Sequence, residues 1–385
     1  MIPEMYKDRS HALIKHKLLK GYLEKLFMII GQHQDTIWYV DCFAGPWQIE
    51  EDDTELKGTS ISISIDIMKG CQKALQERFN RKVTFKAVYI EKDTAAYTRL
   101  ENYLKSVNNP DIETFPLKGD FFDLRTKILE IIGQKEFAFF FIDPTGWKDK
   151  VEMPTLKPLL QRKNCEFIIN FMYDFINRTY FADSSKEDTI AMFGSEPKDC
   201  DLPPKERELF LINQYTNHLK SANIDGNKIR TAYATVLDPI KDRTKYHLVY
   251  ITRHPLGIVK FFEESEKVDI IQNNVRAQTK QERRIEKSQQ PELFPSNEYV
   301  QESEKPYSLK DIKEYWLSTL KEKPIQFGIE KLAEILEEKG WFVKEIQKAF
   351  KQLEKDGMVK NQDAKHPRPT KPIHFKDNEH LVRIK

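Results

Sequence analysis

The sequence predicts an α/β protein built on an open, mostly parallel sheet of Rossmann type, followed by a smaller helical domain. Stretches of apolar, β-branched and aromatic residues alternate with helical patterns, which is typical of strands joined by crossover helices. Four of these strand-like stretches lead to a carboxylate, namely Asp41, Glu91, Asp120 and Asp143. Since the carboxyl ends of parallel strands share one edge of a sheet, we expect the four acids to line that edge.

The composition is that of a globular chain without a membrane anchor. Its 385 residues suggest two or three domains and suffice for a full core. The 62 basic and 60 acidic residues nearly cancel, so net charge points to no class of partner. No apolar run approaches the roughly 18–20 residues that span a bilayer, and the charged first ten residues lack a signal peptide's apolar region. We expect a cytoplasmic protein with no membrane contact.

The four cysteines predict buried free thiols rather than a metal centre. Cys42 and Cys165 fall within predicted strands, and none of the four forms a C-x-x-C pair. No recognised metal motif connects the strand-end acids either, so metal-dependent cleavage is only a minor alternative. We therefore predict no metal ligands.

A helix over residues 11–30, with Ser10 as its cap, precedes the first strand. Lys15 and His16 lie on this helix, and their pattern alone favours an exposed basic face. The first strand then runs through Asp41 into Phe43, Ala44 and Gly45, a tight turn where a ligand can approach the backbone.

Further helices and strands follow in alternation. Residues 137–142 are almost all apolar, which indicates a strand covered on both faces in the centre of a parallel sheet. Polar residues 182–204, rich in proline, predict an excursion over the active edge. The remaining helices are predicted at 61–79, 94–106, 124–132, 154–160, 174–180 and 205–221, and the remaining strands at 83–90, 112–119, 165–171, 229–236 and 246–252, the last two as an antiparallel pair.

A charged helix over 261–289 ends the first domain, which we place at residues 1–290. Its basic stripe is either a solvated surface or a nucleic-acid contact. The stripe consists of Arg276, Lys280, Arg283, Arg284 and Lys287. Residues 291–306 contain several prolines and little periodic pattern, which predicts a linker.

Residues 307–385 predict a winged-helix domain. Three helical patterns, at 309–320, 329–338 and 343–355, precede a strand from Gly357 and a returning strand at 371–375. From Lys305 onward, 18 basic residues face 13 acidic ones, a difference of +5. Lysines of the third helix and a wing around His366 and Arg368 suit DNA or RNA phosphates. A winged helix that contacts protein instead is the alternative.

The acid order of the first domain resembles class I S-adenosylmethionine (SAM) dependent methyltransferases, which implies a Rossmann-like class I methyltransferase sheet. Asp143-Pro144-Thr145-Gly146-Trp147 resembles the Asp-Pro-Pro-Tyr motif of amino-methyltransferases. Lys15-His16 and the strand 39–45 resemble RlmJ-type ribosomal RNA adenine-N6 methyltransferases. The same Asp143–Trp147 stretch and residues 170–178 resemble the three-Cys-motif partner (TcmP) family, over about residues 5–290. That family's name implies a three-Cys-motif protein as partner.

The resemblance implies roles for individual residues. Asp143 and the carbonyl of Pro144 would accept the two N–H bonds of a target amino group, and Trp147 or Tyr173 would stack on the base. The cofactor SAM would contact Lys15, His16, Asp41, Phe43, Ala44, Gly45, Glu91, Asp120 and Phe121. Among these, Glu91 would take the ribose hydroxyls, and Asp120 with Phe121 the adenine. The alternative for each strand-end acid is a cap on the following helix, which explains four such acids in order less easily.

Two departures from the methyltransferase pattern keep two functions open. Trp47 stands where a second glycine is usual, and Thr145-Gly146 stands where Pro-Tyr is expected. The first hypothesis is SAM-dependent methylation of a nucleic-acid base, with adenine N6 as the best candidate. The second is a catalytically inactive methyltransferase-like protein that binds nucleic acid or a protein partner. The sequence does not distinguish DNA from RNA or indicate the oligomeric state.

Overall fold

The computed structural model describes most of the chain as two compact units. Described are residues 3, 6, 9–45, 56–107, 112–180, 186–196, 202–223, 228–290, 300, 305, 307–366 and 368–384. The first unit comprises Met1–Arg253 and Asn274–Tyr299, and the second His254–Asn273 and Val300–Lys385. Trp47, Cys200 and nearly all of the linker predicted at 291–306 lie outside the described residues.

A seven-stranded sheet forms the centre of the first unit, in the order β3-β2-β1-β4-β5-β7-β6. Strands β1 to β5 pair in parallel, whereas β7 is antiparallel to both β5 and β6. The predicted Rossmann-like sheet and its closing antiparallel pair are therefore confirmed. The strands are β1 Thr36–Asp41, β2 Thr84–Glu91, β3 Ile112–Lys118, β4 Phe137–Ile142, β5 Cys165–Phe171, β6 Arg230–Leu237 and β7 Thr244–Thr252.

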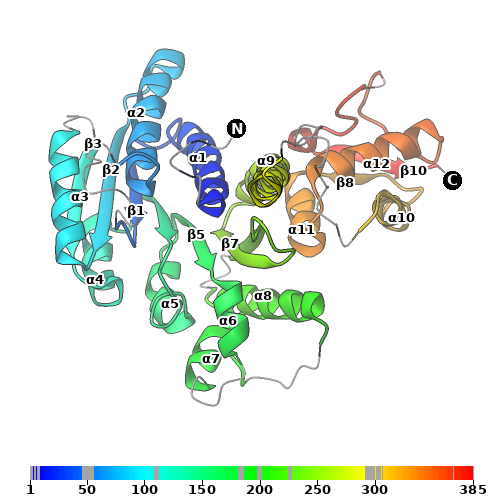
Figure 1. Cartoon of the computed structure of the whole chain (residues 1–385). Helices are drawn as coiled ribbons and strands as arrows, with labels where there is room; N and C mark the ends of the chain where they lie inside the picture. The colour runs from blue at the N-terminus through cyan, green and yellow to red at the C-terminus, as the bar shows by residue number, and fades with distance from the viewer. Residues whose placement is uncertain are drawn as a thin grey trace. The chain divides into compact units, whose positions relative to one another are not determined.

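Helices cover both faces of this sheet (Figure 1). Alternate strand residues point to opposite faces, so Tyr39 and Phe139 lie on the face under Tyr22 of α1. Val40 and Phe140 belong to the opposite core, which α4, α5 and α8 close. The helices are α1 Ser10–Ile30, α2 Ser60–Phe79, α3 Thr94–Ser106, α4 Phe121–Ile132, α5 Met153–Leu160, α6 Tyr173–Thr179, α7 Lys186–Phe193 and α8 Pro204–Lys220.

Buried hydrogen bonds attach α1 to the middle of the sheet. Tyr22 donates its hydroxyl hydrogen to Glu166 Oε2 over 2.6 Å, and Thr252 of β7 donates to Glu166 Oε1 over 2.7 Å. Burial raises the pKa of Glu166. A buried carboxyl group is tolerated where donors satisfy it, so this network fixes how α1 lies across β5 and β7.

Three local predictions for this unit differ from the structure. Ser10 lies inside α1, and Arg9 occupies the N-cap position with no side-chain hydrogen bond there. Helix α4 begins at Phe121, three residues earlier than predicted, because Asp120 caps it. The polar excursion at 182–204 contains the short helix α7. Of the described helices, none combines the length and the apolar character needed to cross a membrane.

From residue 307 onward, the described part of the second unit contains the α-helices α10 to α12 and a three-stranded antiparallel sheet in the order β8-β10-β9. Trp316 of α10 is buried against Phe327 and Phe350, and the indole N–H donates to the carbonyl of Ile346. The elements are α10 Leu309–Thr319, β8 Ile325–Phe327, α11 Ile329–Lys339, α12 Val343–Lys355, β9 Val359–Asn361, the 3-10 helix Phe375–Asp377 and β10 Glu379–Arg383.

The prediction of a strand at 371–375 is wrong, because the strand that pairs antiparallel with β9 is β10. Residues 368–374 form no strand, and the carbonyls of Pro372 and Ile373 accept side-chain hydrogen bonds from Asn361 and Gln347. Strand β8 was not predicted. Helix α9, Pro255–Ser288, begins six residues before its predicted start and contributes residues to both units.

Candidate active site

The carboxyl edge of the parallel strands collects the four predicted acids. Asp41 and Glu91 are the last residues of β1 and β2, Asp143 directly follows β4, and Asp120 follows β3 by two residues. Because the strand order is β3-β2-β1-β4, the acids occur along the edge in the order Asp120, Glu91, Asp41, Asp143. This is the edge of an open α/β sheet at which ligands bind.

Asp143 is held from two sides. Its Oδ2 forms an ion pair with Nζ of Lys15 from α1, and its Oδ1 accepts a 2.7 Å hydrogen bond from Nδ2 of Asn170 at the end of β5. The Lys15 and Asp143 side chains are only 13% and 19% exposed. Lys15 therefore does not belong to a solvated basic face. Two charged or polar donors fix the direction of the Asp143 carboxylate.

Asn170 keeps one polar atom unsatisfied. A carboxylate accepts but does not donate, so the contact with Asp143 orients the Asn170 amide with its nitrogen toward the acid. Its Oδ1 is buried and has no hydrogen-bond partner within the described part of the chain. A buried acceptor without a donor is costly and is typical of positions that bind a ligand.

Asp41 is fully buried between the sheet and the following turn. Phe43 N–H donates to its Oδ1 over 3.2 Å, and the Tyr39 hydroxyl lies 3.4 Å from Oδ2. Burial, with a smaller contribution from the charge of Asp143, raises the pKa of Asp41 to about 7. Asp41 therefore titrates near neutral pH.

Glu91 and Asp120 both bind backbone N–H groups. Glu91 is buried and accepts from Asp93 N–H over 2.6 Å, and burial raises its pKa. Asp120 accepts from Phe122 N–H over 2.9 Å and lies 3.4 Å from Lys92 Nζ. Asp120 therefore caps helix α4. Because each carboxylate oxygen has two lone pairs, both acids can still accept hydrogen bonds from a ligand.

The turn after β1 is attached to the next strand. Ala44 N–H donates to the carbonyl of Ile90 over 2.8 Å. The ring of Phe43 lies 5.3 Å from that of Phe121, which is buried in the core below the edge. Gly45 is the last described residue of this turn, so Trp47, which stands where a second glycine is usual, falls outside the described residues.

His16 faces a different part of the first unit than Lys15. The Tyr6 hydroxyl lies 2.9 Å from His16 Nδ1. Burial lowers the pKa of His16 to about 3 and raises that of Tyr6, so a neutral imidazole and a neutral phenol share this hydrogen bond.

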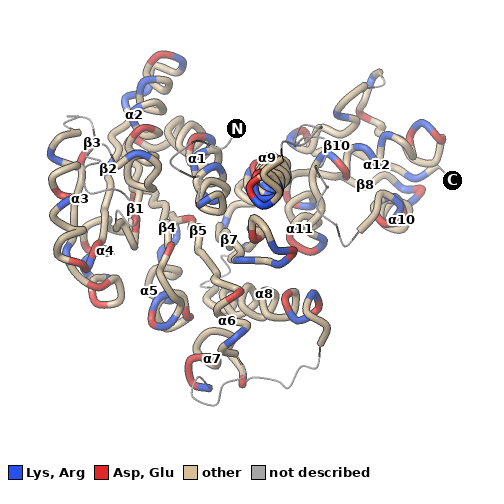
Figure 2. Tube along the Cα trace, in the orientation of Figure 1, with Lys and Arg blue, Asp and Glu red and all other residues tan. Residues whose placement is uncertain are grey.

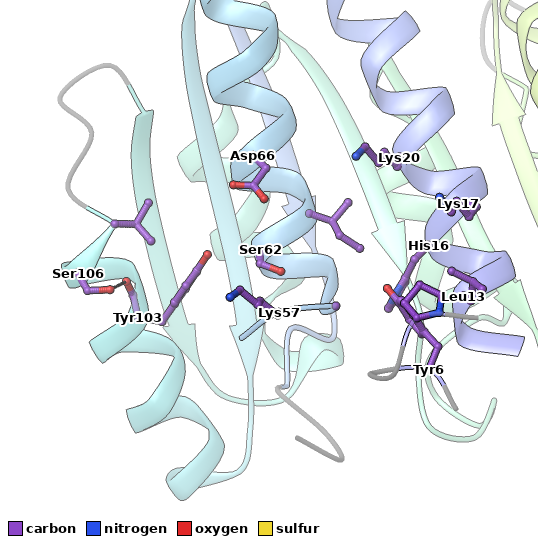
Figure 3. A pocket seen from close by; sticks show the side chains of 14 residues that line it. Tyr6, Leu13, His16, Lys17, Lys20, Lys57, Ser62, Asp66, Tyr103 and Ser106 are labelled. Atoms are coloured by element: carbon purple, nitrogen blue, oxygen red, sulfur yellow. Dashed lines mark hydrogen bonds between the residues drawn. The ribbon is translucent and has the colours of Figure 1, made fainter. Parts of the chain in front are cut away.

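A cavity of about 750 Å³ lies beside the edge, between α1, the start of α2 and the end of α3 (Figure 3). His16 is the single predicted site residue in its lining, whereas the four strand-end acids do not line it. Its charged lining residues are Lys17, Lys20, Lys57 and Asp66. The cavity and the acids are therefore separate features of this unit.

The segment after β4 is shaped by hydrogen bonds of its own. Gly146 has φ +85 and donates its N–H to Met172 Sδ over 3.2 Å. Glu152 accepts from the N–H groups of Asp149, Lys150 and Val151 over 2.6, 2.8 and 3.0 Å. These contacts close the loop that carries Trp147.

The predicted stacking residues do not present an open ring. Trp147 is 6% exposed and Tyr173 7% exposed, and both pack in the core next to β5, as Pro144 is buried too. The aromatic residue that faces solvent here is Phe175 on α6, which is 41% exposed. Sequence reasoning missed Phe175 and missed Asn170 as a partner of Asp143. The position of Asn170 at a strand end was the available signal.

The basic residues of the second unit differ in their contacts, since some bind groups of the protein itself and others are exposed. The Arg368 guanidinium forms two hydrogen bonds to buried Glu379, over 3.0 and 2.7 Å, so it is part of the wing's internal structure. Lys344 pairs with Glu266 over 3.3 Å, and Lys351 donates to the Pro369 carbonyl. Figure 2 shows further basic positions along α12, among them the exposed Lys348 and Lys355.

One potential metal-ligand cluster occurs in the described residues, and it does not include the strand-end acids. It consists of His374, Asp377 and Glu379 in the second unit. Both Glu379 oxygens already bind Arg368, and one of them also accepts from Asn361. The oxygens of Glu379 therefore serve hydrogen bonds within the wing, and we assign no metal site to this cluster.

The order β3-β2-β1-β4-β5-β7-β6 with an antiparallel β7 defines the class I methyltransferase fold, to which the first unit therefore belongs. The model of the family described as "GMT-like wHTH domain" matches residues 280–366, which include α10 to α12 and β8 and β9. A winged helix-turn-helix domain thus follows the methyltransferase-like sheet, as predicted.

Among solved structures, an O-methyltransferase from Bacillus cereus in complex with SAH is similar to this chain. The TM-score is 0.31 at 12% sequence identity, and the match covers 61% of this chain and 80% of that chain. This likeness is too distant to carry an argument on activity, so the fold class rests on the strand order. No curated protein matches the sequence. The finer resemblances to RlmJ-type enzymes and to the three-Cys-motif partner family stay predictions.

Proposed function

We propose that the protein is a SAM-dependent methyltransferase that acts on a base of DNA or RNA, with the exocyclic N6 amino group of adenine as the best candidate. The observation that carries the proposal is the arrangement around Asp143. Lys15 and Asn170 orient its carboxylate at the strand edge, and the buried Asn170 Oδ1 next to it has no donor among the described residues. An amino group supplies N–H donors for such acceptors.

The edge also fits the donors of SAM. That cofactor carries an ammonium group, two ribose hydroxyls and an adenine amine, all of which donate hydrogen bonds. The acceptors at the edge are carboxylates in the order Asp120, Glu91, Asp41. We assign the adenine to Asp120 and Phe121, the ribose to Glu91, and the methionine part to Asp41, Phe43, Ala44 and Gly45 with Lys15 and His16 nearby. No metal ion enters the proposal.

The chain's own residues would prepare the amino group for reaction. When bound, SAM supplies the electrophilic methyl group. The lone pair of an exocyclic amine is delocalised into the base, so Asp143 and the Pro144 carbonyl would accept the two N–H bonds and direct the lone pair toward the methyl. Proline restricts the backbone at that carbonyl. Lys15 and Asn170 are positioning residues, since they act through Asp143.

The winged helix supports a nucleic-acid substrate. Lys348 and Lys355 are exposed on α12, and such lysines bind phosphates electrostatically. In the basic stripe of α9, Arg276 and Lys280 pair with Asp242 over 2.6 and 3.0 Å, so these two residues add little support for a nucleic-acid contact. A three-Cys-motif protein stays a second candidate partner, suggested by the sequence resemblance alone.

Two observations favour an alternative function, that of a catalytically inactive binding protein. The Lys15 ion pair occupies Asp143 Oδ2, and Trp147 and Tyr173 are buried rather than open for stacking. In this alternative, the first unit is a scaffold and the winged helix recruits nucleic acid or a protein partner.

The first test is isothermal titration of the full chain with SAM. We expect micromolar binding that Glu91→Ala abolishes and that Glu113→Ala preserves. Glu113 is a matched control because it lies on the neighbouring strand β3, where it pairs with Lys86 over 3.4 Å. Folded wild-type protein that does not bind SAM would exclude the enzyme.

The second test measures transfer of labelled methyl from SAM to single-stranded and duplex DNA and RNA. We expect base methylation that disappears in Asp143→Ala while SAM binding persists. SAM binding without transfer to any of these substrates would favour the inactive alternative.

A further inference from the structure

A cluster of cations surrounds Asp174 at the start of α6, just past the end of β5. Arg243 Nη1 lies 3.0 Å from Asp174 Oδ1, and Arg178 Nη2 lies 3.7 Å from Oδ2. Lys245, at the start of β7, interacts electrostatically with both Asp174 and Arg243. Arg243 Nε also lies 3.8 Å from Asp238 Oδ2, and Asp238 interacts electrostatically with Lys245. The three cations therefore share two carboxylates and leave one positive charge in excess. We call Asp174, Arg178, Arg243 and Lys245 the α6–β7 cluster.

An exposed aromatic ring adjoins this cluster. Phe175 is 41% exposed, and the Arg178 guanidinium carbon lies 5.7 Å from its ring centroid. That separation is within the range of cation–π attraction. A second exposed Phe–Arg pair, Phe122 with Arg125, differs because the Arg125 guanidinium binds the carbonyls of Phe122, Pro154 and Thr155. Arg178 donates through Nε to the single carbonyl of Asp174 over 2.9 Å, and its side chain is 67% exposed.

The cations continue from the cluster to the candidate active site. Lys245 Nζ lies 3.1 Å from His11 Nδ1 on α1, and it also interacts electrostatically with Lys15, the partner of Asp143. Burial, helped by Lys245 and Lys15, lowers the pKa of His11 to about 4, so His11 is a neutral acceptor at pH 7. A row of cations thus leads from Asp143 to Phe175.

The loop that carries Arg243 is fixed in place. Asp242 pairs with Arg276 and Lys280 of α9 over 2.6 and 3.0 Å, and Arg276 Nε donates to the carbonyl of Asp238 over 3.0 Å. Asp238 in turn accepts from the N–H groups of Ile240 and Lys241. The Arg243 side chain is therefore positioned before a ligand arrives, which lowers the entropy lost on binding.

We propose that Phe175 and the α6–β7 cluster bind an unpaired stretch of nucleic acid next to the target base. One base stacks on Phe175, and its flanking phosphates contact Arg178, Arg243 and Lys245. An exposed aromatic ring interleaved with cations is the arrangement that binds single strands without strong sequence preference. A base that enters the site must leave its stack, which also favours unpaired substrate. The inference deepens the proposed function and rests on it.

The test is fluorescence anisotropy of the full chain with a labelled single-stranded 20-mer, as DNA and as RNA, over a range of salt concentrations. We expect Phe175→Ala to weaken binding by about 5- to 150-fold, the effect of losing one stacked base, and Phe175→Trp to preserve it. Arg178→Gln and Arg243→Gln should each lower the slope of log affinity against log salt by about 0.7. Phe79→Ala is the control, since Phe79 is 45% exposed at the far end of α2.

In the proposed function the winged helix also binds nucleic acid. To separate its contribution, the affinity of the same variants is measured for a labelled duplex of the same sequence. Loss confined to the single strand supports the proposal. Equal affinity and salt slope for wild type, Phe175→Ala and the arginine variants on the single strand would overturn it, as would binding that falls equally in Phe79→Ala. SAM titration is an independent measurement. Phe175-dependent binding in a protein that does not bind SAM would disprove the enzyme and leave a surface that binds single strands but presents no target base.

Discussion

Lys15 on α1 and Asp143 after β4 form an ion pair although 128 positions separate them in the sequence. The pair joins the helix that precedes the sheet to the strand end at which we propose the chemistry. Any change that moves α1 therefore moves a partner of the candidate catalytic acid.

Replacing Lys15 by Met tests this relationship. Asp143 would keep Asn170 but lose its charged partner in a mostly buried setting. We expect the free energy of unfolding to fall by about 1–3 kcal/mol and methyl transfer to fall about tenfold or more, because misplacement of a reacting group is costly. Urea titration and the methylation assay measure both. Lys17→Met, on the exposed side of the same helix, should leave stability unchanged.

The raised pKa of Asp41 predicts that the free energy of unfolding depends on pH. Its folded-state pKa of about 7 exceeds the usual 3.8, so the folded state binds the extra proton between these values. The stability that this proton contributes is fully present below about pH 4 and is lost as pH rises through about 7, by at most about 4 kcal/mol. The difference in unfolding free energy between wild type and Asp41→Asn should follow this curve. A difference that is constant from pH 4 to 8 would contradict the prediction.

The buried network around Glu166 predicts a purely structural effect. Tyr22→Phe removes the hydroxyl that donates to Glu166 over 2.6 Å. We expect a loss of about 1–3 kcal/mol in unfolding free energy, the cost of an under-satisfied buried acceptor. In a double-mutant cycle with Glu166→Gln, the two effects should couple. Additive effects would show that the hydrogen bond contributes little.

Two basic residues of the winged helix should behave differently. Arg368→Ala removes the paired hydrogen bonds to Glu379, so we expect a lower melting temperature. Lys348→Gln should leave the melting temperature unchanged and lower the salt slope of duplex binding by about 0.9. Calorimetry and anisotropy separate the two. If Arg368→Ala affected only binding, the structural role of its contact with Glu379 would be refuted.

Most of the fold follows from local patterns. Four predicted elements match the structure residue for residue, namely the strands 137–142 and 165–171 and the helices 94–106 and 343–355. Their periodic patterns depend only on residues close together in the sequence. Boundaries failed where a cap or a tertiary hydrogen bond decides them. Asp120 starts α4 earlier than its apolar spacing predicts, and β10 begins four residues after the end of the returning strand predicted at 371–375.

The site was predictable only in part. The chain order of the strand-end acids indicated a common edge, which the sheet order provides. The partners of Asp143 were not predictable, because Lys15 and Asn170 reach it from α1 and β5 through tertiary packing. The burial of Trp147 and Tyr173 and the exposure of Phe175 likewise depend on how α6 packs beside β5.

The Glu152 carboxylate, which collects three consecutive backbone N–H groups after Trp147, has a consequence for substrate orientation. Successive N–H groups in such a turn form a nest that attracts anions. Here the Glu152 side chain of the protein itself occupies the nest, so these three N–H groups are not available to bind a phosphate. The phosphates of a substrate would therefore find no free N–H groups in this turn, and in our proposal they bind the arginines of the α6–β7 cluster instead.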